Sequence, residues 1–263
     1  MPAIVGALLV VAMLPLSCNS EARLSSQPSE VNAVRRQGPS DKDLMKQVET
    51  FASSDATVST KAWEVLESYD RQNLISELTR LYGSASDDDY HRVLIAFTFC
   101  KLNHEYAANR SIVLASLAKE SPYKRFYGDW AASLVHRLLL GGDKEVLSDL
   151  FTAAEWSDGA MSEELSGAYS DGIKNDPGGF LKTLAVQSES HRHKVYTLLK
   201  DNSLTKDESE RVKAFLKSIP LNSDLHATAQ ETIKALQSDR NSSGTYNRPL
   251  DRRRTICRLL LRI

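Results

Sequence analysis

The sequence predicts an all-α protein. From about Ser40 to Asp239, apolar residues recur at intervals of three or four, the spacing that places them on one face of a helix. No comparable run alternates apolar and polar residues, as a half-buried strand would. Residues that favour helix ends separate the apolar stripes. We therefore expect about a dozen short helices in antiparallel pairs, arranged as an irregular α-solenoid or as a compact helical bundle.

The first 17 residues form an uncharged and mostly apolar block. Its apolar run from Ala3 to Leu14 is shorter than the roughly 20 residues of a membrane-spanning helix, which is typical of an export signal. The block ends in Leu14-Pro15-Leu16-Ser17-Cys18, which resembles the lipobox of bacterial lipoproteins. The resemblance implies that residues 1–17 are a signal peptide and that Cys18 is lipidated and anchors the protein to a membrane. A plain secretory signal and a short apolar helix of a cytosolic protein are the alternatives.

Residues 18–39 are rich in Ser, Gln and Pro and contain few apolar side chains. Such a composition buries too little surface to offset the entropy of the chain. We expect a disordered tether between Cys18 and a helical domain over residues 40–238.

Twelve apolar stripes support the helical domain. They comprise Leu44, Val48, Phe51; Trp63, Leu66, Tyr69; Leu74, Leu78, Leu81, Tyr82; Tyr90, Val93, Leu94, Phe97, Cys100; Ile112, Leu114, Leu117; Trp130, Leu134, Val135, Leu138; Val146, Leu147, Leu150, Phe151; Leu165, Tyr169, Ile173; Phe180, Leu181, Leu184; Val195, Leu198, Leu199; Val212, Phe215, Leu216, Ile219; and Leu225, Ile233, Leu236. We expect these residues, Trp130 among them, to form the core.

Capping signals mark several helix ends. Ser40 and Ser86 each precede acidic residues, which is typical of an N-cap followed by a negatively charged first turn. Thr205 and Glu208 have the spacing of a capping box. Further residues that start or stop helices are Gly83, Gly141, Gly142, Pro177 and Pro220.

Large aromatic residues recur at a spacing close to that of helical repeats. Trp63, Phe97, Trp130 and Tyr169 are separated by 34, 33 and 39 residues. The body of the chain thus resembles a degenerate HEAT-type α-solenoid, whereas the signatures of tetratricopeptide and ankyrin repeats are absent. A compact irregular bundle stays open, because the number of helices does not separate the two arrangements.

The charge is unevenly distributed along the chain. Residues 239–263 contain seven arginines and two aspartates, a local charge of +5 within a chain whose net charge is −1. An acidic helical body and a tail with a single aromatic residue, Tyr246, do not fit a nucleic-acid-binding protein. The tail is either a basic amphipathic helix for an anionic lipid or partner surface, or a disordered extension.

Few residues suggest chemistry. His191 and His193 lie two positions apart, so on a helix they point in different directions and do not chelate one ion. The single histidines 91, 104, 136 and 226 suggest satisfied surface or half-buried side chains. The run 87–89 of three aspartates lacks the alternating ligands of a calcium loop and suggests helix capping. No motif indicates a cofactor or a metal.

Two cysteines remain besides Cys18. Cys100 lies on an apolar stripe, where we expect a buried and unreactive side chain. A disulfide between Cys100 and Cys257 would require the tail to dock on the domain.

The sequence therefore favours a non-catalytic binding or scaffold protein of the bacterial envelope, anchored through Cys18, with a protein partner and no nucleic acid. Solenoid surfaces bind partners without a recognisable motif, which fits a chain rich in fold signals and poor in chemical ones. The alternative is an envelope enzyme whose site is assembled from residues dispersed over several helices. A periplasmic or secreted location without the anchor is also open.

Overall fold

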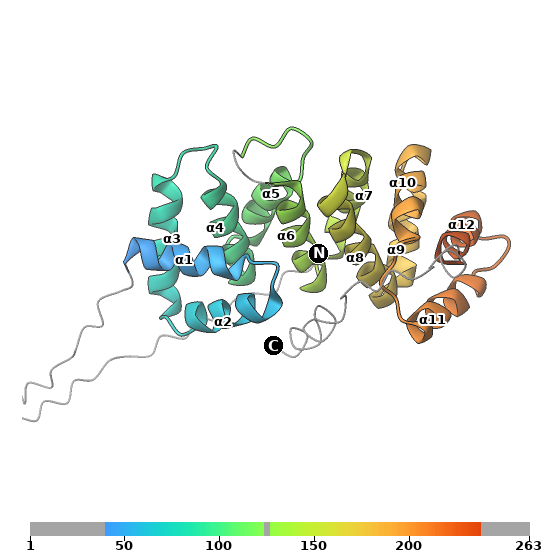
Figure 1. Cartoon of the computed structure of the whole chain (residues 1–263), viewed down its shortest axis with the longest axis horizontal. Coiled ribbons are helices and arrows are strands. Elements are labelled where there is room, and N and C mark those ends of the chain that lie inside the picture. Colours follow the sequence, from blue (N-terminus) through green and yellow to red (C-terminus); the bar gives the residue numbers. More distant parts are fainter. Residues whose placement is uncertain (1–39, 124–126, 238–263) are drawn as a thin grey trace, which may run out of the picture. The chain divides into compact units, whose positions relative to one another are not determined.

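Residues 40–123 and 127–237 are described by a computed structural model, and within these ranges the chain is all-α, as predicted (Figure 1). The helices are α1 Asp41–Phe51, α2 Ala56–Glu67, α3 Arg71–Ser84, α4 Tyr90–Lys101, α5 Tyr106–Ser116, α6 Gly128–Leu140, α7 Leu147–Ala153, α8 Gly159–Asn175, α9 Pro177–Ala185, α10 Glu189–Leu199, α11 Lys206–Lys217 and α12 His226–Gln237. Two 3-10 turns, η1 Lys144–Val146 and η2 Ala154–Trp156, flank α7. The predicted signal peptide, Cys18, tether, basic tail and Cys257 lie outside the described residues.

Most predicted helix ends are confirmed. The Ser40 hydroxyl accepts the backbone N–H of Asp43 at the start of α1. Thr205 and Glu208 form a complete capping box before α11, and Pro177 is the first residue of α9. These signals act between residues three apart or fewer, so a single sequence suffices to predict them.

Two predicted helix boundaries are wrong. The N-cap of α4 is Asp89 and not Ser86, because the Asp89 carboxylate accepts the N–H of His91. Ser86 instead closes a turn before the helix, in which its carbonyl accepts the N–H of Asp89. Gly83 does not stop α3, which continues to Ser84.

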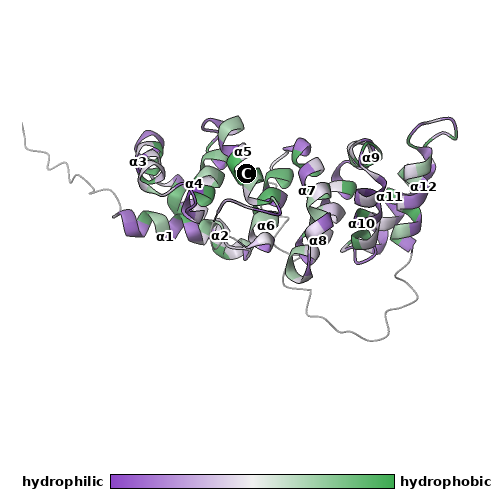
Figure 2. Ribbon diagram, turned by 90° about the horizontal axis from the view of Figure 1, so that it is seen from above, coloured by the Kyte–Doolittle hydropathy of each residue, from purple (hydrophilic) through white to green (hydrophobic). Residues whose placement is uncertain are grey.

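The helices pack mainly on neighbours in the sequence. Helices in extensive contact are never more than three apart in number, from α1 on α4 to α9 on α12. Hydrophobic and hydrophilic residues are mixed along the helices (Figure 2), as expected for amphipathic helices that bury one side. The fourth helix differs, since Val93 to Cys100 are all buried. It therefore lies inside the N-terminal part of this arrangement.

α6 and α8 run parallel. At their starts, a Cβ on Gly128 would lie 2.9 Å from Met161 Sδ, and near their ends a Cβ on Gly172 would lie 3.6 Å from Leu139 Cδ2. In both contacts the α8 residue follows the α6 residue by the same number of positions, so the two helices point in the same direction. The chain returns from the end of α6 to the start of α8 through η1, α7 and η2.

Two aromatic clusters mark the core. Phe51 packs on Trp63 and Phe97 in the N-terminal helices, with ring centroids 5.1 and 5.3 Å away. Phe151, Tyr169 and Phe180 form the second cluster. The buried Tyr169 hydroxyl donates to the Leu150 carbonyl at 2.8 Å, so this ring is fixed at both ends.

Arg137 of α6 reaches into the first cluster. Its guanidinium carbon lies 4.6 Å from the Phe51 ring centroid and 4.5 Å from that of Phe97. It donates to the Phe51 carbonyl at 2.8 Å and to Ser59 Oγ at 3.0 Å. Burial lowers the pKa of this guanidinium to about 10, which Glu164 opposes, so it stays charged at neutral pH. One side chain thereby joins α6 to the end of α1, to α2 and to α4.

We predict that Arg137→Ala lowers the free energy of unfolding by about 3 kcal/mol, because it opens a cavity beside the two rings and removes both donors. Denaturant titration measures the loss. Arg80→Ala is the matched control, since Arg80 forms its ion pairs with Asp41 and Glu77 at the surface, and this variant should leave the midpoint nearly unchanged. A loss below about 1 kcal/mol for Arg137→Ala would contradict the prediction.

Candidate binding sites

A histidine of α6 lies between two carboxylates of α8. His136 Nδ1 is 2.9 Å from Glu164 Oε1, and Nε2 is 3.1 Å from Asp171 Oδ2. The two acids are seven residues apart, so both lie on one face of α8. Gly167 lies between them on that face, where a Cβ would be 3.8 Å from His136 Cε1. The imidazole ring therefore lies over Gly167, between the two acids.

The ion pairs continue to α11. Lys174 Nζ lies 2.5 Å from Asp171 Oδ1 and 3.8 Å from Glu208 Oε1. Glu208 is held in place by its capping box, in which Oε2 accepts the N–H of Thr205 at 2.9 Å. A line of alternating charges therefore runs from α6 across α8 to the start of α11.

His136 is an imidazolium at neutral pH. Burial by itself would lower its pKa, but the hydrogen bonds to Asp171 and Glu164 outweigh that effect and raise the pKa to about 9. Asp171 shows the complementary change: burial would raise its pKa, whereas His136 and Lys174 hold the pKa below the usual value. Both ring nitrogens donate to carboxylates, and the residue is 8% exposed. This histidine is thus arranged to hold helices together and not to accept a proton from a substrate.

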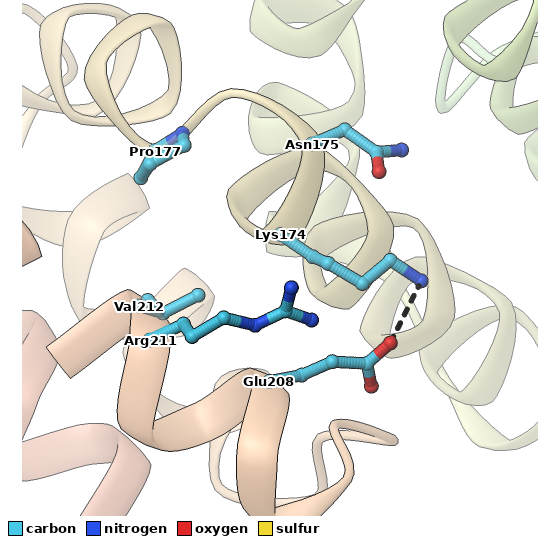
Figure 3. A pocket seen from close by; sticks show the side chains of 6 residues that line it. All are labelled: Lys174, Asn175, Pro177, Glu208, Arg211 and Val212. Carbon is cyan, nitrogen blue, oxygen red and sulfur yellow. Dashed lines mark ion pairs between the residues drawn. The ribbon is translucent and has the colours of Figure 1, made fainter.

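A pocket lies at the end of this line of charges. It has a volume of about 310 Å³ and is open to solvent on one side. The end of α8, the start of α9 and the first half of α11 enclose it. Figure 3 shows Lys174, Glu208 and Arg211 extending toward one another from α8 and α11. The lining residues are Lys174, Asn175, Pro177, Glu208, Arg211 and Val212.

The start of α6 presents two aromatic side chains to solvent. Tyr127 is 68% exposed and Trp130 is 49% exposed. The prediction that Trp130 belongs to the core is therefore wrong. Trp130 lies on the same face of α6 as Leu134 and Leu138. Periodicity predicts only which face of a helix a residue occupies, not whether a neighbouring element covers the first turn of that face. Phe215 of α11 was also predicted to belong to the core. This prediction is wrong as well, because the residue is 38% exposed.

Cys100 is buried, as predicted, and it lies beside a polar cluster that was not predicted. Asp143 accepts hydrogen bonds from the Tyr106 hydroxyl at 2.7 Å and from Arg110 Nε at 2.6 Å. Burial, reinforced by the charge of Asp143, raises the pKa of the Cys100 thiol to about 12. The thiol is therefore protonated at neutral pH and a poor nucleophile.

The remaining predicted polar residues serve helix starts. His191 lies in the first turn of α10, with Nε2 3.0 Å from Glu155 Oε1, while His193 is exposed. Asp89 caps α4, and Asp87 pairs with Arg92. In the described part of the chain, no group of three or more His, Cys, Asp or Glu residues is arranged to hold a metal ion.

The fold and these sites define an all-α protein with a polar pocket and an exposed aromatic pair. No family model matches the chain, and neither a curated protein nor a solved structure is detectably similar to it. Between residues 40 and 237, outside the short gap at 124–126, none of the helices has the length and apolarity that crossing a membrane requires.

The pocket and the line of charges were not predicted. The partners of His136 lie 28 and 35 residues further along the chain, so no local spacing connects them. The sequence did contain one signal, since Glu164, Gly167 and Asp171 place two acids and a gap on one face of a helix. That signal does not reveal which residue fills the gap.

We predict that His136→Gln removes a pH-dependent part of the stability. The raised pKa means that protonated His136 stabilises the fold fully below about pH 6.5, by about 3 kcal/mol, and that this stabilisation is lost as the pH rises through 9. The difference in free energy of unfolding between the parent and the variant should therefore be large at pH 6 and shrink toward pH 10. His193→Gln, at an exposed position, is the control. Equal differences at both pH values would contradict the prediction.

Proposed function

We propose that the protein is a non-catalytic scaffold that binds a protein partner through the start of α6. The observation that carries this proposal is the exposure of Tyr127 and Trp130 within one helical turn. Tyrosine and tryptophan contribute a large share of the binding energy at protein interfaces, because they bury much area and lose little conformational entropy. The apolar stripe of α6 is buried at Leu134 and Leu138 and continues to the exposed Trp130. This continuation supports a contact surface at the start of the helix.

The chemistry of the buried groups favours binding over catalysis. His136 donates from both ring nitrogens to carboxylates, and the Cys100 thiol has a raised pKa. A general base must be free to accept a proton, and a nucleophilic cysteine must ionise readily. Neither group meets its requirement in this arrangement. His136 and Cys100 therefore do not support the enzyme alternative.

The location that we propose is the bacterial envelope, with the chain anchored through a lipid on Cys18. The support is the resemblance of Leu14-Pro15-Leu16-Ser17-Cys18 to a lipobox. Several acyl chains on one residue would hold the helical domain at a membrane surface, since each buried CH₂ contributes about 0.8 kcal/mol. In this arrangement the residues between Cys18 and α1 serve as the tether.

We predict that a photo-crosslinking amino acid at Tyr127 captures one discrete protein partner in cells. The same amino acid at Val186, which is 81% exposed at the end of α9, is the matched control. Adding Trp130→Ala should abolish the adduct while the helical circular dichroism signal and the melting temperature stay close to those of the parent. Equal adducts at both positions, or an adduct that survives Trp130→Ala, would contradict the proposed surface.

The anchor has a separate test. Protein from a bacterial membrane fraction should have a mature N-terminus at Cys18 and an intact mass that includes acyl groups. Cys18→Ala should release the chain into the soluble fraction, because the apolar anchor is lost. A retained Met1 in the membrane-bound protein would contradict the anchor and leave the proposed binding surface on α6 unaffected.

A further inference from the structure

The pocket between α8, α9 and α11 contains polar groups whose hydrogen bonds are already committed. Lys174 is shared between Asp171 and Glu208. One carboxylate oxygen of Glu208, Oε2, accepts from both the backbone N–H and the hydroxyl of Thr205, and the other, Oε1, faces Lys174. These groups are positioned by the protein itself and have little remaining capacity for a ligand.

Arg211 and Asn175 differ from them. Both side chains are exposed at the pocket, and neither has a hydrogen bond or an ion pair with any other residue in the described ranges. Arg211 attracts Glu208 electrostatically and helps to hold the pKa of that carboxyl below its usual value. All five N–H donors of its guanidinium are nevertheless available to a ligand. The pocket therefore offers one planar cation and one amide to a ligand.

One wall of the pocket is apolar. Pro177 and Val212 line it. Phe215 is not among the lining residues, but its ring lies close to Gly178, the residue after Pro177, where a Cβ would be 3.6 Å from Phe215 Cζ. Phe215 is 38% exposed. A ligand that fits this pocket has an anionic end and an apolar side.

We propose that this pocket binds the C-terminal carboxylate of a polypeptide that ends in an apolar residue. Arg211 binds the carboxylate through two parallel N–H donors, a geometry that guanidinium and carboxylate groups share. Asn175 pairs with the last peptide group, and the wall of Pro177 and Val212 covers the last side chain. A volume of about 310 Å³ lies at the small end of the range for ligand sites and fits one or two residues.

This site is separate from the aromatic pair on α6 and does not depend on the function proposed for that pair. The two tests are therefore independent: Arg211→Gln should leave the crosslink at Tyr127 unchanged, and Trp130→Ala should leave the pocket unchanged. A partner that contacts only one of the two surfaces would fail only one of the tests.

The experiment titrates the ¹⁵N-labelled full chain with acetyl-Ala-Val that has a free carboxyl terminus and follows the amide signals of Asn175, Gly178 and Gly179. We expect these signals to shift at millimolar peptide. The same peptide with an amidated C-terminus should bind at least tenfold more weakly, because Arg211 loses its charged acceptor. Acetyl-Ala-Gly with a free carboxyl terminus should bind several-fold more weakly, because it lacks the apolar side chain.

Two variants with the same change of charge complete the test. Arg211→Gln should abolish the shifts, whereas Lys217→Gln, an exposed position at the end of the same helix, should preserve them. Both replaced residues are exposed, so both variants should keep the parent circular dichroism spectrum. Equal binding of the amidated peptide, or of inorganic phosphate, would overturn the proposal, as would full binding by Arg211→Gln. Equal binding of acetyl-glutamic acid amide would show an acidic side chain to be the ligand and would also overturn it.

Discussion

Two neighbouring cations on α6 join this helix to the helices before and after it. Arg137 packs on the rings of Phe51 and Phe97 and donates to the carbonyl of Phe51, the last residue of α1, 86 residues earlier in the sequence. His136, one position before it, bonds to two acids of α8. Adjacent residues on a helix point about 100° apart, so these two side chains reach different neighbours. The position of α6 is thereby fixed toward both the preceding and the following helices.

Glu164 interacts with both cations of α6, His136 and Arg137. It bonds to His136, and its negative charge also opposes the loss of the proton from Arg137. Asp171, Lys174 and Glu208 extend the alternation of charge to the edge of the pocket. Buried charges are unfavourable unless each has a partner, and in this protein the pairing ends where Arg211 meets solvent. Arg211, the cation that we propose as the binding group of the pocket, therefore lies at the open end of this series.

The features that the sequence predicts are those that depend on near neighbours. The Ser40 cap and the Thr205–Glu208 box were predictable because donor and acceptor lie within one turn. The error at Ser86 arose where two possible caps, Ser86 and Asp89, compete within four residues. Trp130 was misassigned because helical phase does not report the length of the neighbouring helices. The pocket depends on where α8 and α11 meet, which no local pattern encodes.

The limited reach of the helix contacts has a mechanical consequence. Extensive contacts extend no further than the third helix along, although the buried apolar side chains form one continuous cluster. A force applied at one end is therefore carried first by the contacts of the nearest helices in the series. In such a series, terminal helices detach while interior ones persist. A tether pulling at α1 would thus load the α1–α2 pair first. Arg137, which joins the last residue of α1 to the first turn of α2, would be the first deep interaction to resist extension.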